Sequence, residues 1–174
     1  SLEKQAADED PGPFSLMTKL VSDPITPVFL AGTGMTGADE LDIALVERLL
    51  ELSEQCIHTY LRAQIEAGAK AMIVCEPAAN LVYFSPNQLE VNPDVFDRFV
   101  MRPMQRIKQL LAASNVDLIF HDCGELTDGM VRSFATMGAS MLSLGSSRKL
   151  WEDAALVSKQ TVLYGNLPTK HFYS

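Results

Sequence analysis

The stretch Val116-Asp117-Leu118-Ile119-Phe120-His121-Asp122-Cys123-Gly124 decides the fold of this chain. Its apolar part predicts a strand over residues 116–121 that ends at His121, with Cys123 two residues further on in a loop. A similar apolar run covers residues 71–76 and is broken by Pro77. Continuous runs of this kind are typical of parallel strands that are buried on both faces.

Helical patterns alternate with such strands along the chain. Apolar residues at spacings of three and four predict a long helix over residues 42–67, with Gly68 at the position where a helix ends. A loop containing Pro86 and Pro93 follows the strand at 71–76. The remaining pattern predicts helices and strands in turn over residues 94–113 (helix), 116–121 (strand), 126–137 (helix), 139–144 (strand), 148–158 (helix) and 161–165 (strand).

Strands that alternate with helices predict a parallel α/β sheet. The starts of the last three strands lie 23 and 22 residues apart, which leaves room for short loops only. This regularity favours a parallel (β/α) barrel of the TIM type over an open sheet. A full barrel takes about 200 to 250 residues, whereas this chain has 174. We therefore expect an incomplete barrel over residues 11–174, preceded by a linker or tag-like segment at residues 1–10.

The composition excludes several classes of protein. The net charge is −8, with 14 basic and 22 acidic residues, and the sequence contains no stripe of basic residues. A nucleic-acid partner is therefore not expected. Apolar runs are much shorter than the roughly 20 residues of a membrane span, and no signal-peptide pattern opens the chain. The odd number of cysteines, 3, argues against a disulfide framework. We expect a soluble, cytoplasmic protein.

A glycine pattern at residues 32–37 matches the G-x-G-x-x-G turn that binds dinucleotide phosphates, after a possible strand at 27–31. A second strand with an acidic end should follow about 20 residues later. Residues 42–67 predict a helix instead, so a flexible glycine-rich loop is the preferred interpretation.

Three residues at predicted strand ends are candidates for chemistry. His121 and Cys123 carry the two donor types that zinc prefers, and in parallel α/β folds the carboxyl ends of strands carry the chemistry. The alternative is a capped strand end with an incidental buried thiol. Glu76 ends the preceding strand, where a carboxylate could serve as a general base, a substrate contact or a zinc-shell group. Its alternative is a helix cap or a surface acid.

The other cysteine and histidines carry no clear signal. Cys56 is expected in the core of the long helix, and His58 is expected to be exposed or satisfied. His171 has no visible partner in the sequence.

Taken in order, several segments resemble the uroporphyrinogen decarboxylase superfamily, which includes corrinoid-dependent methyltransferases that methylate thiols such as coenzyme M. The similarity runs over residues 12–168, and the ordered set is more specific than any one block. The blocks are Gly12-Pro13-Phe14-Ser15-Leu16, Gln64-Ile65-Glu66-Ala67-Gly68-Ala69 with the strand to Glu76, Ser85-Pro86 with Phe96, Phe99 and Pro103, His121-Asp122-Cys123-Gly124, Gly138-Ala139 and Gly165-Asn166-Leu167.

This resemblance implies a (β/α)8 barrel, of which the chain covers the later central part. His121 and Cys123 match the methyltransferase branch, in which this histidine and cysteine bind zinc together with a later cysteine, placed by the resemblance beyond Ser174. Zinc there holds the acceptor thiol as a thiolate, the nucleophilic form. The methyl donor is a methylated corrinoid on a partner protein, and the acceptor is a small-molecule thiol.

Two alternatives stay open. The decarboxylase branch uses no metal and needs an acidic residue from the family's N-terminal part. This chain has Lys19 where that branch carries tyrosine, and Pro77 where it carries serine. The other alternative is a truncated barrel that acts as a binding or assembly module without chemistry. Uncovered strand edges and apolar faces predict a homo-oligomer in either case.

Overall fold

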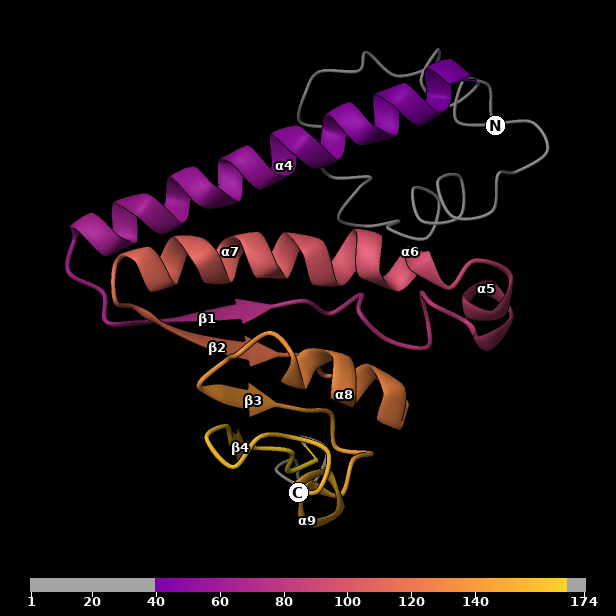
Figure 1. Ribbon diagram of the computed structural model, residues 1–174, viewed down its shortest axis with the longest axis vertical. Coiled ribbons are helices and arrows are strands. Elements are labelled where there is room, and N and C mark those ends of the chain that lie inside the picture. Colours follow the sequence, from indigo (N-terminus) through magenta and orange to yellow (C-terminus); the bar gives the residue numbers. More distant parts are fainter. Residues whose placement is uncertain (1–39, 169–174) are drawn as a thin grey trace, which may run out of the picture.

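Four parallel strands form the centre of the protein in the computed structural model, which describes residues 40–168 (Figure 1). They are β1 (Ala71–Cys75), β2 (Asp117–His121), β3 (Met141–Ser143) and β4 (Val162–Tyr164). Each strand pairs with the next one in the sequence, in the order β1-β2-β3-β4. This confirms the predicted parallel α/β architecture. The consecutive order is that of a (β/α) barrel, because a doubly wound sheet reverses its order at a switch point.

The long helix α4 (Glu40–Glu66) precedes β1 and agrees with the predicted helix over 42–67. It ends before Gly68, which has a φ of 97° that a side chain would disfavour. The helical segment predicted over 94–113 consists of α6 (Asp94–Phe96), a π-helical turn η1 (Asp97–Met101) and α7 (Arg102–Ala113). Helix α7 lies between α4 and the strands β1 and β2 (Figure 1).

The segment predicted as a loop around Pro86 contains a short helix, α5 (Pro86–Val91). Its start is fixed by a capping box, in which the Ser85 hydroxyl accepts a hydrogen bond from the Gln88 backbone and the Gln88 side chain accepts one from the Ser85 backbone. A proline in the first turn suits a helix because its missing N–H has no partner there. The prediction of a plain loop was therefore wrong.

Two helices follow β2 and β3. Helix α8 (Asp128–Ala135) begins after Thr127, whose hydroxyl accepts the backbone N–H of Met130 at 3.1 Å. Helix α9 (Leu150–Asp153) is much shorter than the helix predicted over 148–158. After it, the backbone N–H groups of Ala155 and Leu156 bond to carbonyls three residues back, so the chain tightens into turns before β4.

The hydrophobic core lies between one face of the sheet and the helices α7 and α8. Leu118, Phe120 and Leu142 from the strands are fully buried there. The Phe120 ring lies 4.8 Å from the ring of Phe134 on α8, measured between centroids. Ile107 and Leu111 of α7 and Val131 of α8 complete the contact.

The other face of the sheet carries a row of apolar side chains in register. Ile73, Ile119, Met141 and Val162 are successive partners across the four strands. Ile73 is 60% exposed and Val162 53% exposed. The prediction that the strands are buried on both faces was therefore wrong for the described residues. Alternation explains it, since helices cover one face and the other is the one that lines the interior of a barrel.

Several expectations fall outside the described residues. They concern the linker-like residues 1–10, the Gly12–Leu16 block with Lys19, the strand at 27–31, the glycine pattern at 32–37 and His171. Among the helices between residues 40 and 168, none has the length and apolar character needed to cross a membrane.

Candidate metal and catalytic site

The carboxyl ends of the four strands present a second row of side chains on the uncovered face. Cys75, His121, Ser143 and Tyr164 are successive register partners at the last position of each strand. This row lies two residues beyond the apolar row of Ile73, Ile119, Met141 and Val162, so period-2 alternation places both rows on the same face. The uncovered face therefore changes from apolar to polar where the strands end.

His121 is oriented by a side chain on the neighbouring strand. Its Nδ1 lies 2.9 Å from the hydroxyl oxygen of Ser143, which is buried at the end of β3. Gly165, with a φ of 89°, packs against this hydroxyl, since a Cβ placed there would lie 3.1 Å from the Ser143 oxygen. With Nδ1 engaged, Nε2 is the ring nitrogen left to bind a metal or a proton.

Buried polar side chains fix the backbone of the loop that carries Cys123. Asp122 is fully buried and accepts the backbone N–H of Gly124 at 2.6 Å. Asn80, 2% exposed, spans the preceding loop: its side-chain nitrogen donates to the Pro77 carbonyl, and its side-chain oxygen accepts the Val82 backbone N–H. The second carboxylate oxygen of Asp122, Oδ2, is buried and has no hydrogen-bond partner among the described residues. The Cys123 thiol itself is exposed. The loop thus buries its carboxylate and presents its thiol to solvent.

Two carboxyl groups at this edge of the sheet have raised pKa values. Burial raises the pKa of Asp122 to about 6, against the opposing effects of the Gly124 N–H and of the nearby Asn80 side chain. Burial is also the main cause that raises the pKa of Glu76, and the negative charge of Asp122 adds to it. The Ala78 N–H, which Glu76 accepts at 3.1 Å, acts in the opposite direction. The two acids follow paired strand ends, since Cys75 is the register partner of His121.

The structure does not bring Glu76, His121 and Cys123 together as one cluster. Within residues 40–168, no three His, Cys, Asp or Glu side chains lie close enough to hold a metal ion. Alternation sets Cys75 beside His121, whereas Glu76 lies near Asp122. An imidazole nitrogen and a thiol are nevertheless the donor types of zinc sites, so His121 and Cys123 fit this metal by their chemistry. Further donors must come from elsewhere or from water.

The expected place of Cys56 was wrong. This cysteine is exposed on α4, because it does not lie on the side of the helix that packs against the rest of the protein, where Leu61 is 5% exposed. His58 is half-buried, with its Nε2 3.7 Å from a carboxylate oxygen of Glu54. Neither residue lies at the strand ends.

Sequence reasoning missed the residues that support the candidate site. Ser143, Asn80 and Gly145 have no motif of their own, and only their partners across strands show their role. A Cβ on Gly145 would lie 2.6 Å from the backbone oxygen of Gly124, so the loops after β2 and β3 are in close contact. A serine one strand after a candidate histidine, at the matching strand end, is the one signal that could have been used.

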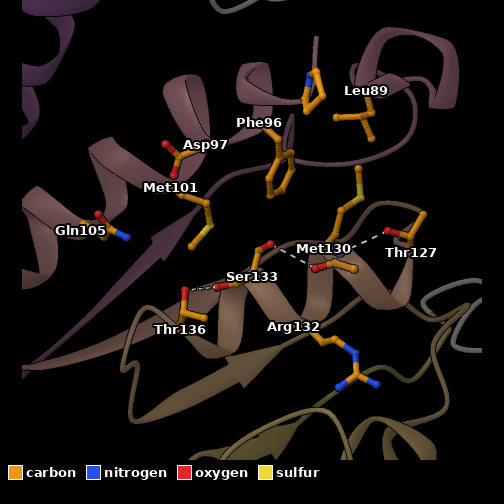
Figure 2. A pocket seen from close by; sticks show the side chains of 12 residues that line it. Leu89, Phe96, Asp97, Met101, Gln105, Thr127, Met130, Arg132, Ser133 and Thr136 are labelled. Atoms are coloured by element: carbon orange, nitrogen blue, oxygen red, sulfur yellow. Dashed lines mark hydrogen bonds between the residues drawn. The ribbon is translucent and has the colours of Figure 1, made fainter. Parts of the chain in front are cut away.

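A separate hollow lies on the helical side of the molecule, between η1 with α7 and α8 (Figure 2). Its volume is about 500 Å³, and its lining includes Phe96, Met101 and Met130 together with Asp97, Gln105 and Thr136. All of these residues belong to the helices or their ends, which cover the face of the sheet opposite the strand-end row. The hollow is therefore distinct from the candidate site.

The consecutive parallel strands and the polar groups at their carboxyl ends define a protein of the (β/α)-barrel class. Within this class, the chain belongs to the uroporphyrinogen decarboxylase (URO-D) family, whose model matches residues 11–173. The resemblance that the sequence blocks indicated is thereby confirmed.

Relatives of two kinds occur in this family. A protein from Thermus thermophilus named uroporphyrinogen decarboxylase is 30% identical over 156 residues, which are 89% of this chain and 41% of the relative. A protein from Methanosarcina barkeri named methylcobamide:CoM methyltransferase MtaA is 28% identical over 100 residues, 58% of this chain and 26% of the relative. The chain thus spans less than half the length of these relatives.

A solved structure supports the fold. A methyltransferase from Methanosarcina mazei superimposes with a TM-score of 0.56 at 20% sequence identity. The match covers 74% of this chain and 35% of that one. This likeness concerns the fold, and the four-stranded sheet corresponds to part of a barrel.

Proposed function

We propose that this chain belongs to the methyl-transfer branch of the family and contributes to zinc-dependent transfer of a methyl group from a methylated corrinoid to a thiol. The carrying observation is the pair His121 and Cys123 at the carboxyl end of β2. The Nδ1 of His121 is engaged at 2.9 Å by Ser143, which leaves Nε2 as a donor, and the thiol of Cys123 is exposed. A decarboxylase that uses no metal would not need this pair of zinc donors, whereas a zinc-dependent methyltransferase would.

The residues of the chain would act as follows. His121 Nε2 and the Cys123 thiolate supply two of the four ligands of a tetrahedral ion. Zinc held by these two residues would lower the pKa of an acceptor thiol and so favour the nucleophilic thiolate near neutral pH. Glu76 follows the neighbouring strand but does not form one cluster with His121 and Cys123, so its proposed role is to take up the thiol proton through water. A methylated corrinoid would supply the methyl group, which would pass to the thiolate sulfur while the electron pair of the broken cobalt–carbon bond stays on the corrinoid.

The proposed partners follow from this chemistry. The donor is a methylated corrinoid carried on a partner protein, and the acceptor is a small-molecule thiol. The expected homo-oligomer and the cytoplasmic location stay predictions. The exposed row that includes Ile73 and Val162 supports self-association, which light scattering on the 174-residue chain would check.

Uroporphyrinogen decarboxylation is the second candidate, favoured by the match of the Thermus thermophilus decarboxylase to 89% of the chain. Against it stands Pro77, at a position where the resemblance places a serine in that branch. A non-catalytic assembly module is the third. It has no need of zinc, so metal content separates it from the first.

A paired assay tests the proposal. Protein supplied with zinc is incubated with methylcobalamin and a small thiol, and loss of the methyl–cobalt absorbance is followed together with thioether formation. We expect equal amounts of thioether and demethylated corrinoid, dependent on zinc, and no such turnover in a folded His121→Ala variant. The variant Cys56→Ser, changed at an exposed thiol on α4, should behave as the wild type. Porphyrinogen decarboxylation without added metal, or neither activity, would contradict the proposal.

A further inference from the structure

The last residue of β3 lies in direct contact with the candidate ligand on β2. Ser143 and His121 are Cα register partners, and the backbone N–H of Asp122 donates to the Ser143 carbonyl at 3.0 Å. The side-chain contact between Nδ1 and the hydroxyl, at 2.9 Å, therefore rests on a fixed backbone frame. Gly165 limits the space around the hydroxyl from the β4 side, because any Cβ there would approach to 3.1 Å.

The direction of this hydrogen bond decides which form of the imidazole is present. A neutral histidine carries its proton on one ring nitrogen and an acceptor lone pair on the other. If Nδ1–H donates to the Ser143 oxygen, Nε2 keeps a free lone pair and can ligate a metal. If the hydroxyl donates to Nδ1, the proton sits on Nε2 and must leave before a metal binds. Metal-binding histidines almost always donate their second ring N–H to an oxygen acceptor, most often a carboxylate, a backbone carbonyl or water.

We propose that Ser143 is a positioning residue for His121, and that its hydroxyl oxygen accepts the Nδ1–H and so holds the Nε2 lone pair ready for zinc. This inference rests on the proposed function. Strand β3, Met141–Ser143, contains no histidine, cysteine or acidic residue, so Ser143 is the side chain through which this strand takes part in the site. The buried position of Ser143, 7% exposed, keeps water from replacing it as the acceptor.

The chain offers a matched control at the other end of the same region. The Ser140 hydroxyl donates to a carboxylate oxygen of Asp117 at 2.6 Å, again between the β3 segment and β2. Ser140→Ala therefore removes the same kind of inter-strand hydrogen bond, but at the amino end of the sheet. Any general loss from weakening the contact of β2 with β3 should appear in both variants.

Zinc affinity is the first readout, measured by competition with a chromogenic chelator for the wild type, Ser143→Ala, Ser143→Thr and Ser140→Ala. We expect Ser143→Ala to bind about 10- to 100-fold more weakly, as is usual when a partner of a metal-binding histidine is lost. Ser143→Thr keeps the hydroxyl and should restore most of the affinity, and Ser140→Ala should match the wild type. Equal affinity of wild type and Ser143→Ala would overturn the inference.

The second readout needs no metal. In ¹⁵N NMR of the metal-free protein, the ring nitrogens of His121, assigned through a His121→Gln variant, report which nitrogen carries the proton. We expect the Nδ1–H form to dominate in the wild type and to decline in Ser143→Ala. An unchanged tautomer would overturn the role of Ser143. A wild type that binds no zinc would instead contradict the proposed function, and the tautomer comparison would still decide whether Ser143 orients His121.

Discussion

Arg148 holds the fully buried carboxylate of Asp153 through two nitrogens of its guanidinium group. The Nε atom lies 3.2 Å from one carboxylate oxygen, and an Nη atom bonds to the other. Arg148 also donates to the Leu126 carbonyl at 3.1 Å and to Asp128 at 2.8 Å. One side chain thus ties the loop after β3 to the segment that leads into α8, on the same edge of the sheet as His121.

Removing the arginine should leave a buried charge without its partner. We expect Arg148→Met to lower the free energy of unfolding by about 3–5 kcal/mol, the usual cost of breaking a buried ion pair from one side. Asp128→Asn, at a carboxylate whose side chain is 68% exposed, should cost less than about 1 kcal/mol. Urea unfolding of both variants checks this, and similar losses in the two would contradict it.

The contact between Gly124 and Asn80 makes a sharper test of the Cys123 loop. A Cβ on Gly124 would lie 2.2 Å from the Asn80 side chain, which is itself held by hydrogen bonds. We expect Gly124→Ala to destabilise the protein by about 1–3 kcal/mol, the usual cost of overpacking.

The matched control is Gly129→Ala in helix α8, where a new Cβ would meet its nearest neighbour, the Thr127 hydroxyl, at 3.5 Å. Alanine in a helix should be neutral there or stabilise by up to about 1 kcal/mol. Thermal unfolding would distinguish the two changes. A Gly124→Ala protein as stable as the wild type would show that Asn80 does not hold this loop.

Periodicity and apolar runs were enough to predict the sheet, because each strand and its crossover helix carry their own local pattern. The consecutive strand order then followed from the short spacing between strands. The helix predicted over 148–158 failed because the tight turns after Asp153 depend on backbone bonds that no periodicity reveals. The prediction that Cys56 is buried was wrong for a similar reason, because the sequence pattern of α4 does not show which side of the helix packs against α7.

The candidate site was predictable only in part. His121 and Cys123 could be placed at a strand end from one strand's sequence alone. Ser143 and Asn80 act through contacts with other segments, 22 residues away in the first case. Alternation further separates Cys75 from Glu76, and only the register shows that Cys75 is the one beside His121.

Asp122 should make stability depend on pH in a definite direction. Its folded pKa, about 6, lies above the ordinary value of 3.8, so folding favours the protonated acid. The stabilisation is complete below about pH 4 and is lost as the pH rises through 6. At about 1.4 kcal/mol per pKa unit, the wild type should lose roughly 2 kcal/mol between pH 4 and pH 7 relative to Asp122→Asn, which mimics the neutral acid.

Urea unfolding of the metal-free proteins at several pH values between 4 and 7 measures this difference. Asp94→Asn, at an exposed carboxylate in the first turn of α6, serves as the control and should follow the wild type. A constant difference between wild type and Asp122→Asn across this range would show that Asp122 ionises as freely as a solvent-exposed acid.

Zinc binding by the wild type and two cysteine variants is the decisive test of a zinc site at His121 and Cys123. The measurement is the number of zinc ions per chain and their dissociation constant, determined by chelator competition for the wild type, Cys123→Ser and Cys56→Ser. We expect one ion per wild-type chain with modest affinity, because His121 and Cys123 supply only two of four ligands. Cys123→Ser should bind zinc more than about tenfold more weakly, because losing even a hydrogen-bond partner of a metal ligand lowers metal affinity by that factor. Cys56→Ser should bind zinc as tightly as the wild type. A wild type that binds no zinc, or a Cys123→Ser variant that binds it equally well, would contradict a zinc site at these residues.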